Sequence, residues 1–256
     1  PRHFFSNFDG LMASYEIPST LFLMNIEGYW GYFKDKVVVS EREMEAKTTG
    51  FHGLISHISF KNWTLRGSYH QGTTSVTLDD VTQFSGLLNQ LGFSQSADSL
   101  GTTGVTEVFQ FSANYETVDY FVRGELNRIK ADFIFVPDTD GYFFSTGYNY
   151  FPFSSYISYS KNTTDYEQPA SDIPIGLSPV LDGLAYSYLS IFEQLPVNSS
   201  EAYTLGTRWD IQPGLALKGE VSLIKGAENE SAFFNIKDTA FDREALLYLI
   251  ALEWVF

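Results

Sequence analysis

Apolar and polar residues alternate along most of this chain in short runs, with the two-residue period of β-strands. In the final run, Glu244 to Phe256, one face is wholly apolar: Leu246, Tyr248, Ile250, Leu252, Trp254 and Phe256. The other face mixes apolar residues with Glu253. A transmembrane helix needs about 20 apolar residues, whereas a tilted transmembrane strand needs about 9–11. The run therefore predicts a strand whose apolar face meets lipid.

Ten similar runs precede it, so the sequence predicts eleven strands: 11–17, 21–30, 51–60, 63–70, 107–115, 120–128, 142–150, 155–161, 201–210, 215–225 and 244–256. Short turns (18–20, 61–62, 116–119, 151–153 and 212–214) alternate with long loops (33–50, 73–104, one that includes 137–141, 163–200 and 226–243). This alternation is typical of outer-membrane barrels, which have short periplasmic turns and long extracellular loops. Soluble sandwiches mix loop lengths at both ends.

A charge–Gly–polar repeat marks four of the predicted strands: Glu27-Gly28-Tyr29, Arg66-Gly67-Ser68, Arg123-Gly124-Glu125 and Lys218-Gly219-Glu220. In each, the charged residue and the residue after Gly share a face, and apolar residues flank the Gly on the other. The charges are therefore expected to face one common space. The glycines are expected to permit coiling and close packing.

Aromatic residues end the strands that enter a short turn or the chain end: Tyr15, Phe60, Tyr115, Tyr150, Trp209 and Phe256. Outer-membrane barrels carry aromatic girdles at their membrane interfaces. The six residues are predicted to form the periplasmic girdle.

The strand pattern and the ending Trp254-Val-Phe256 resemble the C-terminal part of Gram-negative outer-membrane porins. The resemblance implies an all-β fold, an antiparallel transmembrane β-barrel that occupies residues 1–256 as one domain. Porins have 16 or 18 strands, so it also implies a partial barrel with an odd number of strands missing upstream. The implied function is a water-filled outer-membrane channel for passive diffusion of ions and small hydrophilic solutes, without enzymatic activity. The implied partners are two further copies in a homotrimer, membrane lipid and lipopolysaccharide, and the assembly machinery that reads Phe256.

Composition fits a barrel: 18% of the 256 residues are charged, 17% are aromatic and the mean hydropathy is −0.11. Lipid-facing residues alternate with polar lumen residues, so the average comes out neutral. The net charge of −15 excludes nucleic acid as a partner, because such binding needs a basic surface. Acidic residues in the loops predict a channel mouth that favours cations.

The predicted lumen carries eleven ionisable residues, which are the pore-lining candidates: Glu16, Glu27, Arg66, His70, Arg123, Glu125, Arg208, Asp210, Lys218, Glu220 and Glu253. Rings of side-chain charge set the ion preference of a pore. The alternative is that many of them pair across neighbouring strands and only hold the wall together.

Two loop segments, 79–91 and 183–195, have helical periodicity, and Asp79 and Asp80 can cap the first. Such helices are expected to pack over the barrel mouth, or else to narrow the entrance or contact a partner. Asp138 to Gly141 resembles part of a calcium loop but lacks the later ligands, which favours a plain turn.

No metal or cofactor site is predicted: the four histidines lack metal-binding spacing, and His52 and His57 lie on opposite faces of one strand. No nucleophile–base constellation is visible. Two alternatives to a porin stay open, a soluble β-sandwich that binds carbohydrate and an outer-membrane barrel enzyme.

Overall fold

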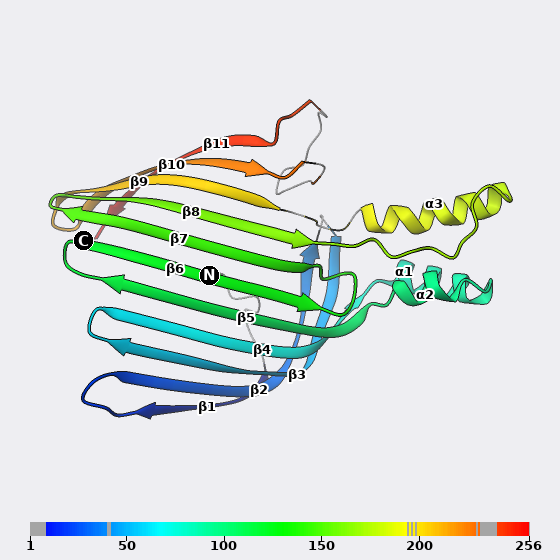
Figure 1. Ribbon diagram of the computed structural model, residues 1–256, viewed down its shortest axis with the longest axis horizontal. Coiled ribbons are helices and arrows are strands. Elements are labelled where there is room, and N and C mark those ends of the chain that lie inside the picture. The colour runs from blue at the N-terminus through cyan, green and yellow to red at the C-terminus, as the bar shows by residue number, and fades with distance from the viewer. Residues whose placement is uncertain are drawn as a thin grey trace.

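One antiparallel sheet of eleven strands dominates the computed structural model, which describes residues 9–39, 42–193, 195, 197, 199–228, 230 and 240–255. Its strands follow chain order, each hydrogen-bonded to the next (Figure 1). They are β1 (Asp9–Ile17), β2 (Leu23–Val39), β3 (Arg42–Phe60), β4 (Trp63–Thr77), β5 (Thr103–Glu116), β6 (Tyr120–Ala131), β7 (Asp138–Tyr150), β8 (Phe153–Asp165), β9 (Ser200–Gln212), β10 (Leu215–Gly226) and β11 (Glu244–Trp254). The predicted all-β antiparallel fold and all eleven strands are confirmed.

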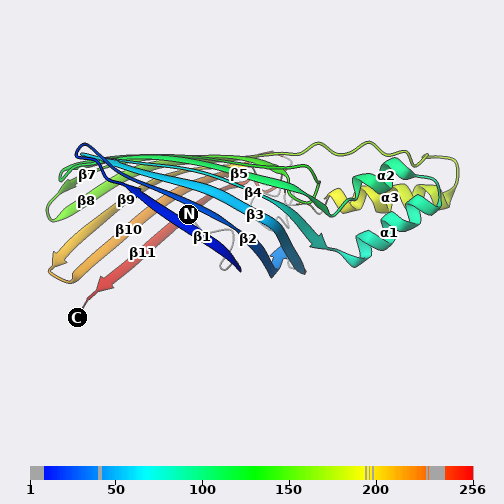
Figure 2. The same ribbon diagram turned by 90° about the horizontal axis from the view of Figure 1, so that it is seen from below.

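The five short turns lie together at one end of the sheet, and the long connections lie at the other (Figure 1). Turn chemistry explains the tight reversals. Gly214 follows Pro213 with a φ of 80°, a conformation that glycine adopts without strain, and Lys61 has a φ of 51°. The sheet is curled, and its edge strands β1 and β11 turn to the same side (Figure 2). Within the described residues these two edges do not pair with each other.

The prediction of a charged loop at 33–50 is wrong. β2 and β3 continue as one long hairpin whose ladder runs to the pair Val39 and Arg42. The charges are compatible with a strand because opposite signs meet across it: Lys34 Nζ lies 3.0 Å from Glu45 Oε1. The β-branched run that ends at Val39 also favours an extended backbone.

Three helices lie beyond the strand ends on the side of the long connections (Figures 1 and 2). They are α1 (Asp79–Gln90), α2 (Ser94–Ser99) and α3 (Pro179–Glu193). We call them, with the segments that join them to the sheet, the helical cap. Its apolar core is Leu88, Ala97, Leu100, Ile173, Ala185, Tyr188 and Phe192. Two long connections far apart in sequence therefore fold together.

The two predicted helices are confirmed as α1 and α3, whereas the sequence did not predict α2. The predicted capping of α1 is wrong. Its N-cap is Leu78, which makes no side-chain capping bond, and Asp79 and Asp80 lie inside the first turn. There they still stabilise the helix through its dipole. None of the described helices is long and apolar enough to cross a membrane.

Candidate functional site

The eleven predicted pore-lining residues all lie on one face of the sheet. The cross-strand registers trace this face from Glu16 beside Asn25 on β2 to Glu253 beside Ala216 on β10. Side chains alternate between faces along each strand, and directly paired residues share a face. The prediction that these charges face one common space therefore agrees with the structure.

This face is concave, because side chains on it meet across an intervening strand. Tyr29 on β2 passes over Gly53 on β3 to hydrogen-bond His70 Nδ1 on β4. Tyr156 on β8 passes over β9 and donates to a carboxylate oxygen of Glu220 on β10. Strands two apart are separated by about 10 Å in a flat sheet. Contact at that separation needs a curled sheet and little side chain on the middle strand.

Ion pairs hold part of the concave face together. Arg208 Nε lies 2.7 Å from Asp210 Oδ1, its Nη1 lies 2.6 Å from Glu253 Oε2, and Lys218 Nζ also contacts Glu253. Arg123 pairs with Glu116 at 3.0 Å. For these residues the alternative role, bracing the wall, is what the geometry shows.

Three acidic residues of the same face have a different environment. The side chains of Glu16, Glu27 and Glu125 make no hydrogen bond or ion pair within the described part of the chain. Arg66 donates a long 3.3 Å hydrogen bond to Gln110 and has no carboxylate partner there. These four charges remain available to ions and solutes on this face.

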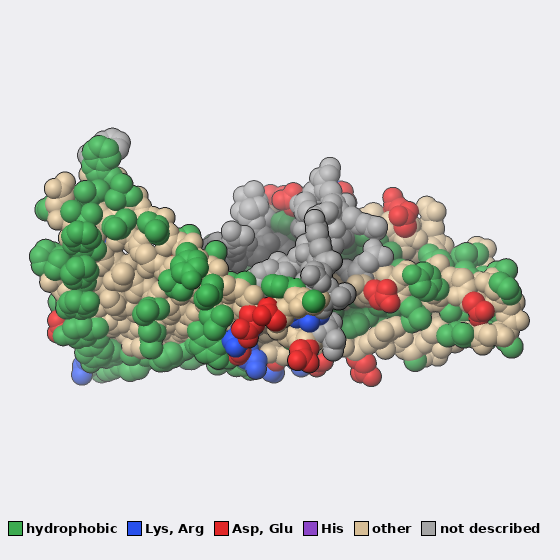
Figure 3. Space-filling view, turned by 90° about the horizontal axis from the view of Figure 1, so that it is seen from above, with side chains coloured by type: hydrophobic (Ala, Val, Ile, Leu, Met, Phe, Trp, Pro, Cys, Tyr) green, Lys and Arg blue, Asp and Glu red, His purple; other side chains and the backbone are tan. Residues whose placement is uncertain are grey.

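The opposite, outward face is largely apolar, and none of the described residues covers it. Large side chains along its middle are widely exposed: Leu126 44%, Ile157 56%, Leu205 61% and Ile250 81%. We call this zone the apolar belt, and Figure 3 shows its apolar side chains over the half of the sheet distant from the helices. So large an uncovered apolar surface is not stable in water and marks a contact with lipid or protein.

An aromatic rim bounds the apolar belt at the short-turn end. It comprises Tyr15, Phe60, Trp63, Tyr115, Tyr120, Tyr148, Tyr150, Phe153, Trp209 and Trp254, all on the outward face. Neighbouring rings pack against one another: the ring centroids of Trp63 and Tyr115 lie 4.9 Å apart, and those of Phe153 and Trp209 lie 6.0 Å apart. Five of the six predicted girdle residues belong to this rim. Phe256 lies outside the described residues.

A charged rim, which the sequence did not predict, bounds the apolar belt at the other end. One outward residue from each strand β5 to β11 alternates in sign: Glu107, Arg128, Asp140, Lys161, Glu201, Lys225 and Glu244. Arg128 pairs with Asp140, and Lys225 Nζ lies 2.7 Å from Glu244 Oε1. Figure 3 shows acidic and basic side chains gathered near the strand ends, before the helices.

The two rims keep the same separation on β5 to β9. Eight residues lead from Tyr115 to Glu107, from Tyr120 to Arg128 and from Trp209 to Glu201. At about 3.4 Å per residue this is about 27 Å along the strand, or about 20 Å along a membrane normal at a strand tilt of about 40°. The apolar band of outer-membrane barrels is about 25 Å tall, so the apolar belt has nearly the height that a bilayer requires.

The prediction of close packing at the glycines of the charge–Gly–polar repeat is wrong. A Cβ added at Gly67 or Gly219 would meet nothing within 4 Å, and those glycines face outward. The close contacts occur at other glycines, on the concave face. A Cβ at Gly147 would come within 2.4 Å of Phe121, and one at Gly206 within 2.3 Å of Tyr156. A glycine paired across strands with an aromatic residue of the concave face, as Gly206 is with Tyr156, is the sequence feature that marks these close contacts.

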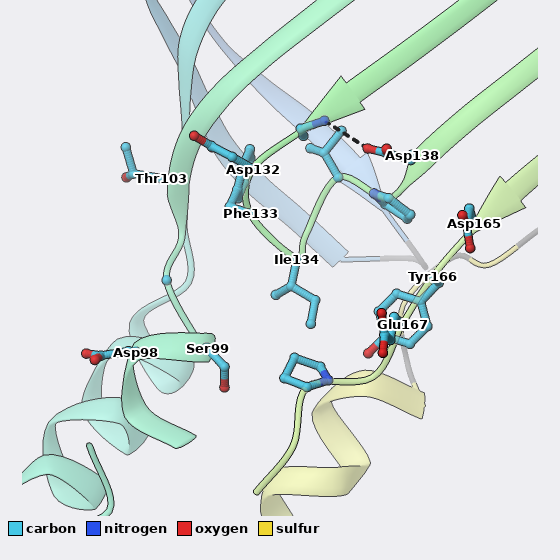
Figure 4. Close-up of a pocket in the computed structure, with 15 residues that line it drawn as sticks. Asp98, Ser99, Thr103, Asp132, Phe133, Ile134, Asp138, Asp165, Tyr166 and Glu167 are labelled. Carbon is cyan, nitrogen blue, oxygen red and sulfur yellow. Dashed lines mark hydrogen bonds between the residues drawn. The ribbon is translucent and has the colours of Figure 1, made fainter. Parts of the chain in front are cut away.

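A cavity of about 570 Å³ opens between the helical cap and the β6–β7 connection (Figure 4). Five carboxylates are among its lining residues and no basic side chain is: Asp98, Asp132, Asp138, Asp165 and Glu167. Asp138 accepts a 3.1 Å hydrogen bond from the Ala131 amide. The predicted plain turn at 138–141 is wrong, because these residues open β7. No group of three potential metal ligands occurs among the described residues.

A polar network inside the helical cap ties its two connections together. Asp172 accepts hydrogen bonds from the Ser96 hydroxyl at 2.6 Å and from the Gln95 and Ser96 amides at 3.1 and 3.0 Å. These bonds, that from the Ser96 hydroxyl above all, hold the pKa of Asp172 below its ordinary value. Burial raises the pKa of Tyr166, beside the cavity, to about 12.

No protein-family model matches the chain, and no curated protein matches it. Among solved structures, LpxR from Salmonella typhimurium is similar over 96% of this chain and 88% of its own, with 10% sequence identity and a TM-score of 0.32. The ferric yersiniabactin uptake receptor FyuA from Yersinia pestis is similar over 96% of this chain and 40% of its own, with 8% identity and a TM-score of 0.32. Likeness of this degree concerns the fold and assigns no substrate.

Since likeness at a TM-score of 0.32 carries no argument about role or location, location in an outer membrane stays a prediction. The prediction that the chain has no enzymatic activity is corrected. The strand pattern is equally compatible with an outer-membrane enzyme, so absence of enzymatic activity does not follow from it.

Proposed function

We propose that this chain forms the wall of an outer-membrane channel of the porin type, through which ions and small hydrophilic solutes diffuse passively. One observation carries the proposal: the eleven ionisable candidates lie on the concave face, while the outward face is apolar between two rims. A transmembrane channel needs that division, because lipid meets one side of the wall and water the other. The homotrimer and the recognition of Phe256 by the assembly machinery stay predictions.

The preference of this channel is for cations. The cavity beside the helical cap offers carboxylates and no basic side chain among its lining residues. On the concave face, three acidic residues, Glu16, Glu27 and Glu125, have no ion-pair partner within the described residues. Of the arginines on that face, Arg66 alone has none there. The unpaired acidic groups therefore outnumber the unpaired arginine. Carboxylates at a mouth with low-dielectric walls raise the local concentration of cations.

Planar-bilayer recordings test the proposal. The purified chain, reconstituted under a potassium chloride gradient, should conduct with a reversal potential on the cation-selective side. Neutralising three cavity carboxylates, Asp98→Asn, Asp165→Asn and Glu167→Gln, should reduce this selectivity. A matched triple variant elsewhere on the cap, Asp79→Asn, Asp80→Asn and Glu193→Gln, should leave it near the wild-type value.

The same recordings can refute it. A chain that inserts but does not conduct would refute the channel. Anion selectivity, or equal reversal potentials for the two triple variants, would refute the acidic mouth. The bias should also weaken between about 0.1 M and 1 M salt, because the Debye length falls from about 10 Å to about 3 Å.

A further inference from the structure

The helical cap carries acidic side chains and no basic ones. Its two segments, 78–102 and 166–199, contain no lysine, arginine or histidine, although the whole chain has 16 lysines and arginines among its 256 residues. The same segments contain seven carboxylates: Asp79, Asp80, Asp98, Glu167, Asp172, Asp182 and Glu193. On the face in view, Figure 3 shows red and green side chains over the helices and no blue ones. Side-chain charges of one sign on the cap attract cations and repel anions.

Large apolar side chains are exposed at the tip of the cap, where the connection from β8 turns into α3. Ile175 is 71% exposed, Leu177 74% and Val180 73%. Figures 1 and 2 show this tip at the end of the cap distant from the sheet. We call these three residues, together with Tyr186 on α3, which is 72% exposed, the tip patch. The tip patch is separate from the apolar belt, which lies over the other half of the molecule.

Hydrogen bonds hold the turn that carries the tip patch. Asp182 Oδ1 accepts a 2.6 Å hydrogen bond from the Gly176 amide, and Ser178 Oγ accepts one of 3.3 Å from the Leu181 amide at the start of α3. Gly176 has a φ of 83°, which glycine adopts without strain. An ordered turn therefore presents the apolar side chains on either side of Gly176. A surface that is fixed in advance loses less conformational entropy when a partner binds.

Carboxylates flank the tip patch along α3. Asp182 lies four residues before Tyr186 and Glu193 seven residues after it, and these spacings place the three on one face of the helix. All three are exposed. A basic side chain above the Tyr186 ring would lie between two carboxylates, where it gains both a cation–π contact and ion pairs. This face of α3 thus suits a positively charged partner.

We propose that the helical cap binds a cationic, amphipathic segment of another polypeptide. Lysine and arginine side chains of the segment pair with the carboxylates of the cap and lie over Tyr186. Its apolar side chains cover Ile175, Leu177 and Val180, which removes their apolar surface from water. The proposal goes beyond the channel function and does not depend on conduction.

Other occupants fit the helical cap less well. A second copy placed cap to cap would set carboxylates against carboxylates, with no basic residue of either cap to offset them. Anionic lipid and nucleic acid are repelled for the same reason. An inorganic cation gains nothing from the apolar side chains. The 15 residues of α3 span about 22 Å between the tip patch and Glu193, farther than a small organic cation reaches.

Fluorescence polarisation of labelled peptides tests the proposal on the folded chain in nonionic detergent. The probe is a helical peptide of leucine and lysine, about 15 residues long to match α3, with its lysines on one face. Its binding should weaken severalfold between about 0.1 M and 1 M salt. The variant Leu177→Ser/Tyr186→Ser, which changes two exposed side chains, should weaken it about tenfold or more. The matched control Val118→Ser/Phe151→Ser, which changes two exposed apolar side chains at the short turns, should bind like the wild type.

Four outcomes would overturn the proposal. Equal affinity for oligolysine of the same length would exclude the apolar contact, and equal affinity for a peptide with glutamate in place of lysine would exclude charge complementarity. Undiminished binding by Leu177→Ser/Tyr186→Ser, with α3 still protected from hydrogen exchange, would place the peptide elsewhere. Wild-type dimers in sedimentation that this variant does not form would make a second copy the occupant.

The peptide assay is separate from the bilayer recordings. It needs the folded helical cap and no conducting pore. A chain that conducts but does not bind the peptide refutes only the docking surface, and a chain that binds the peptide but does not conduct refutes only the channel.

Discussion

The helical cap and the sheet bury their apolar residues in opposite ways. In the cap, Tyr188 and Leu88 are fully buried, and Leu100 is 2% exposed. In the sheet, many large apolar residues point outward and are exposed, whereas the small or polar residues Ser68, Ser145 and Ala216 are buried. The same chain thus folds one region for water and another for a medium that accepts apolar surface.

This difference tells which solvent each region meets. A water-soluble sandwich covers one face of each sheet with the other sheet, at a spacing of about 10 Å. Only one sheet occurs among the described residues, and no layer covers its outward face. The soluble sandwich considered from the sequence therefore does not fit. The helical cap instead buries its large apolar side chains, as water-soluble regions do.

The largest expected effect is in the cap core. Leu88→Ala should lower the stability of the cap by about 2–5 kcal/mol, because it leaves a cavity in a close-packed site. Hydrogen exchange should quicken in α1, α2 and α3 and stay unchanged in β5 to β10. The neighbour Leu87, 43% exposed, provides the control, and Leu87→Ala should change little. Equal effects of the two variants would contradict a water-excluded core.

A charge placed in the apolar belt should be nearly as costly. Leu205→Arg should destabilise the chain in lipid vesicles by about 2–4 kcal/mol, as expected for Arg at the middle of a bilayer. Thr204→Arg, one residue away on the concave face, should cost much less. Denaturant unfolding in vesicles measures both. Substitutions at water-exposed sites usually change the free energy of unfolding by no more than about 0.5 kcal/mol. A cost that small for Leu205→Arg would mean that the outward face does not meet lipid.

A smaller effect should follow at the glycine beneath Tyr156. Gly206→Ala should cost about 1–3 kcal/mol, because the added methyl group overlaps the ring and displaces Tyr156 from Glu220. Gly219→Ala, on the open outward face of the next strand, is the matched control and should be close to neutral. The same unfolding assay compares them. Similar costs at both positions would mean that the concave face is looser than the structure shows.

The smallest effect concerns acid and the Asp172 network. The folded pKa of Asp172 lies below its ordinary value of 3.8. Its stabilisation of α2 is therefore complete above that ordinary value and is lost as the pH falls toward the lower folded pKa. Exchange of the Ser96 amide, corrected for its intrinsic pH dependence, should quicken over this acid range. In Asp172→Asn it should already be fast at neutral pH. A wild-type amide equally protected throughout would exclude the carboxylate as its partner.

The sequence was a good guide to the strands because the alternation of the outward face is strict. It was a poorer guide to side-chain contacts between strands two apart, which form only because the sheet is curled. Nothing local places Tyr156 over Gly206 or links it to Glu220 two strands away, since both contacts depend on curvature. The long β2–β3 hairpin was missed because its charged residues resemble a loop until their cross-strand partners are known.

The charged rim was missed although its signal is present in the chain. On β5 to β9 each of its residues lies eight positions from an aromatic of the opposite rim, as Glu201 does from Trp209. A single charge at the end of an apolar run does not by itself indicate a rim shared with other strands. Only the register of the whole sheet shows that their signs alternate.

That alternation also bears on how the strands find their order. Backbone hydrogen bonds can form in parallel as well as in antiparallel pairs, so they do not by themselves keep β8, which runs parallel to β6, from pairing with it. The side chains can. If β6 skipped its neighbour and met β8, Arg128 would come near Lys161, and like charges across a strand pair are unfavourable. Skipping any one strand between β5 and β11 brings equal signs together. The alternating signs of the rim thus disfavour pairings that skip one strand of the sheet.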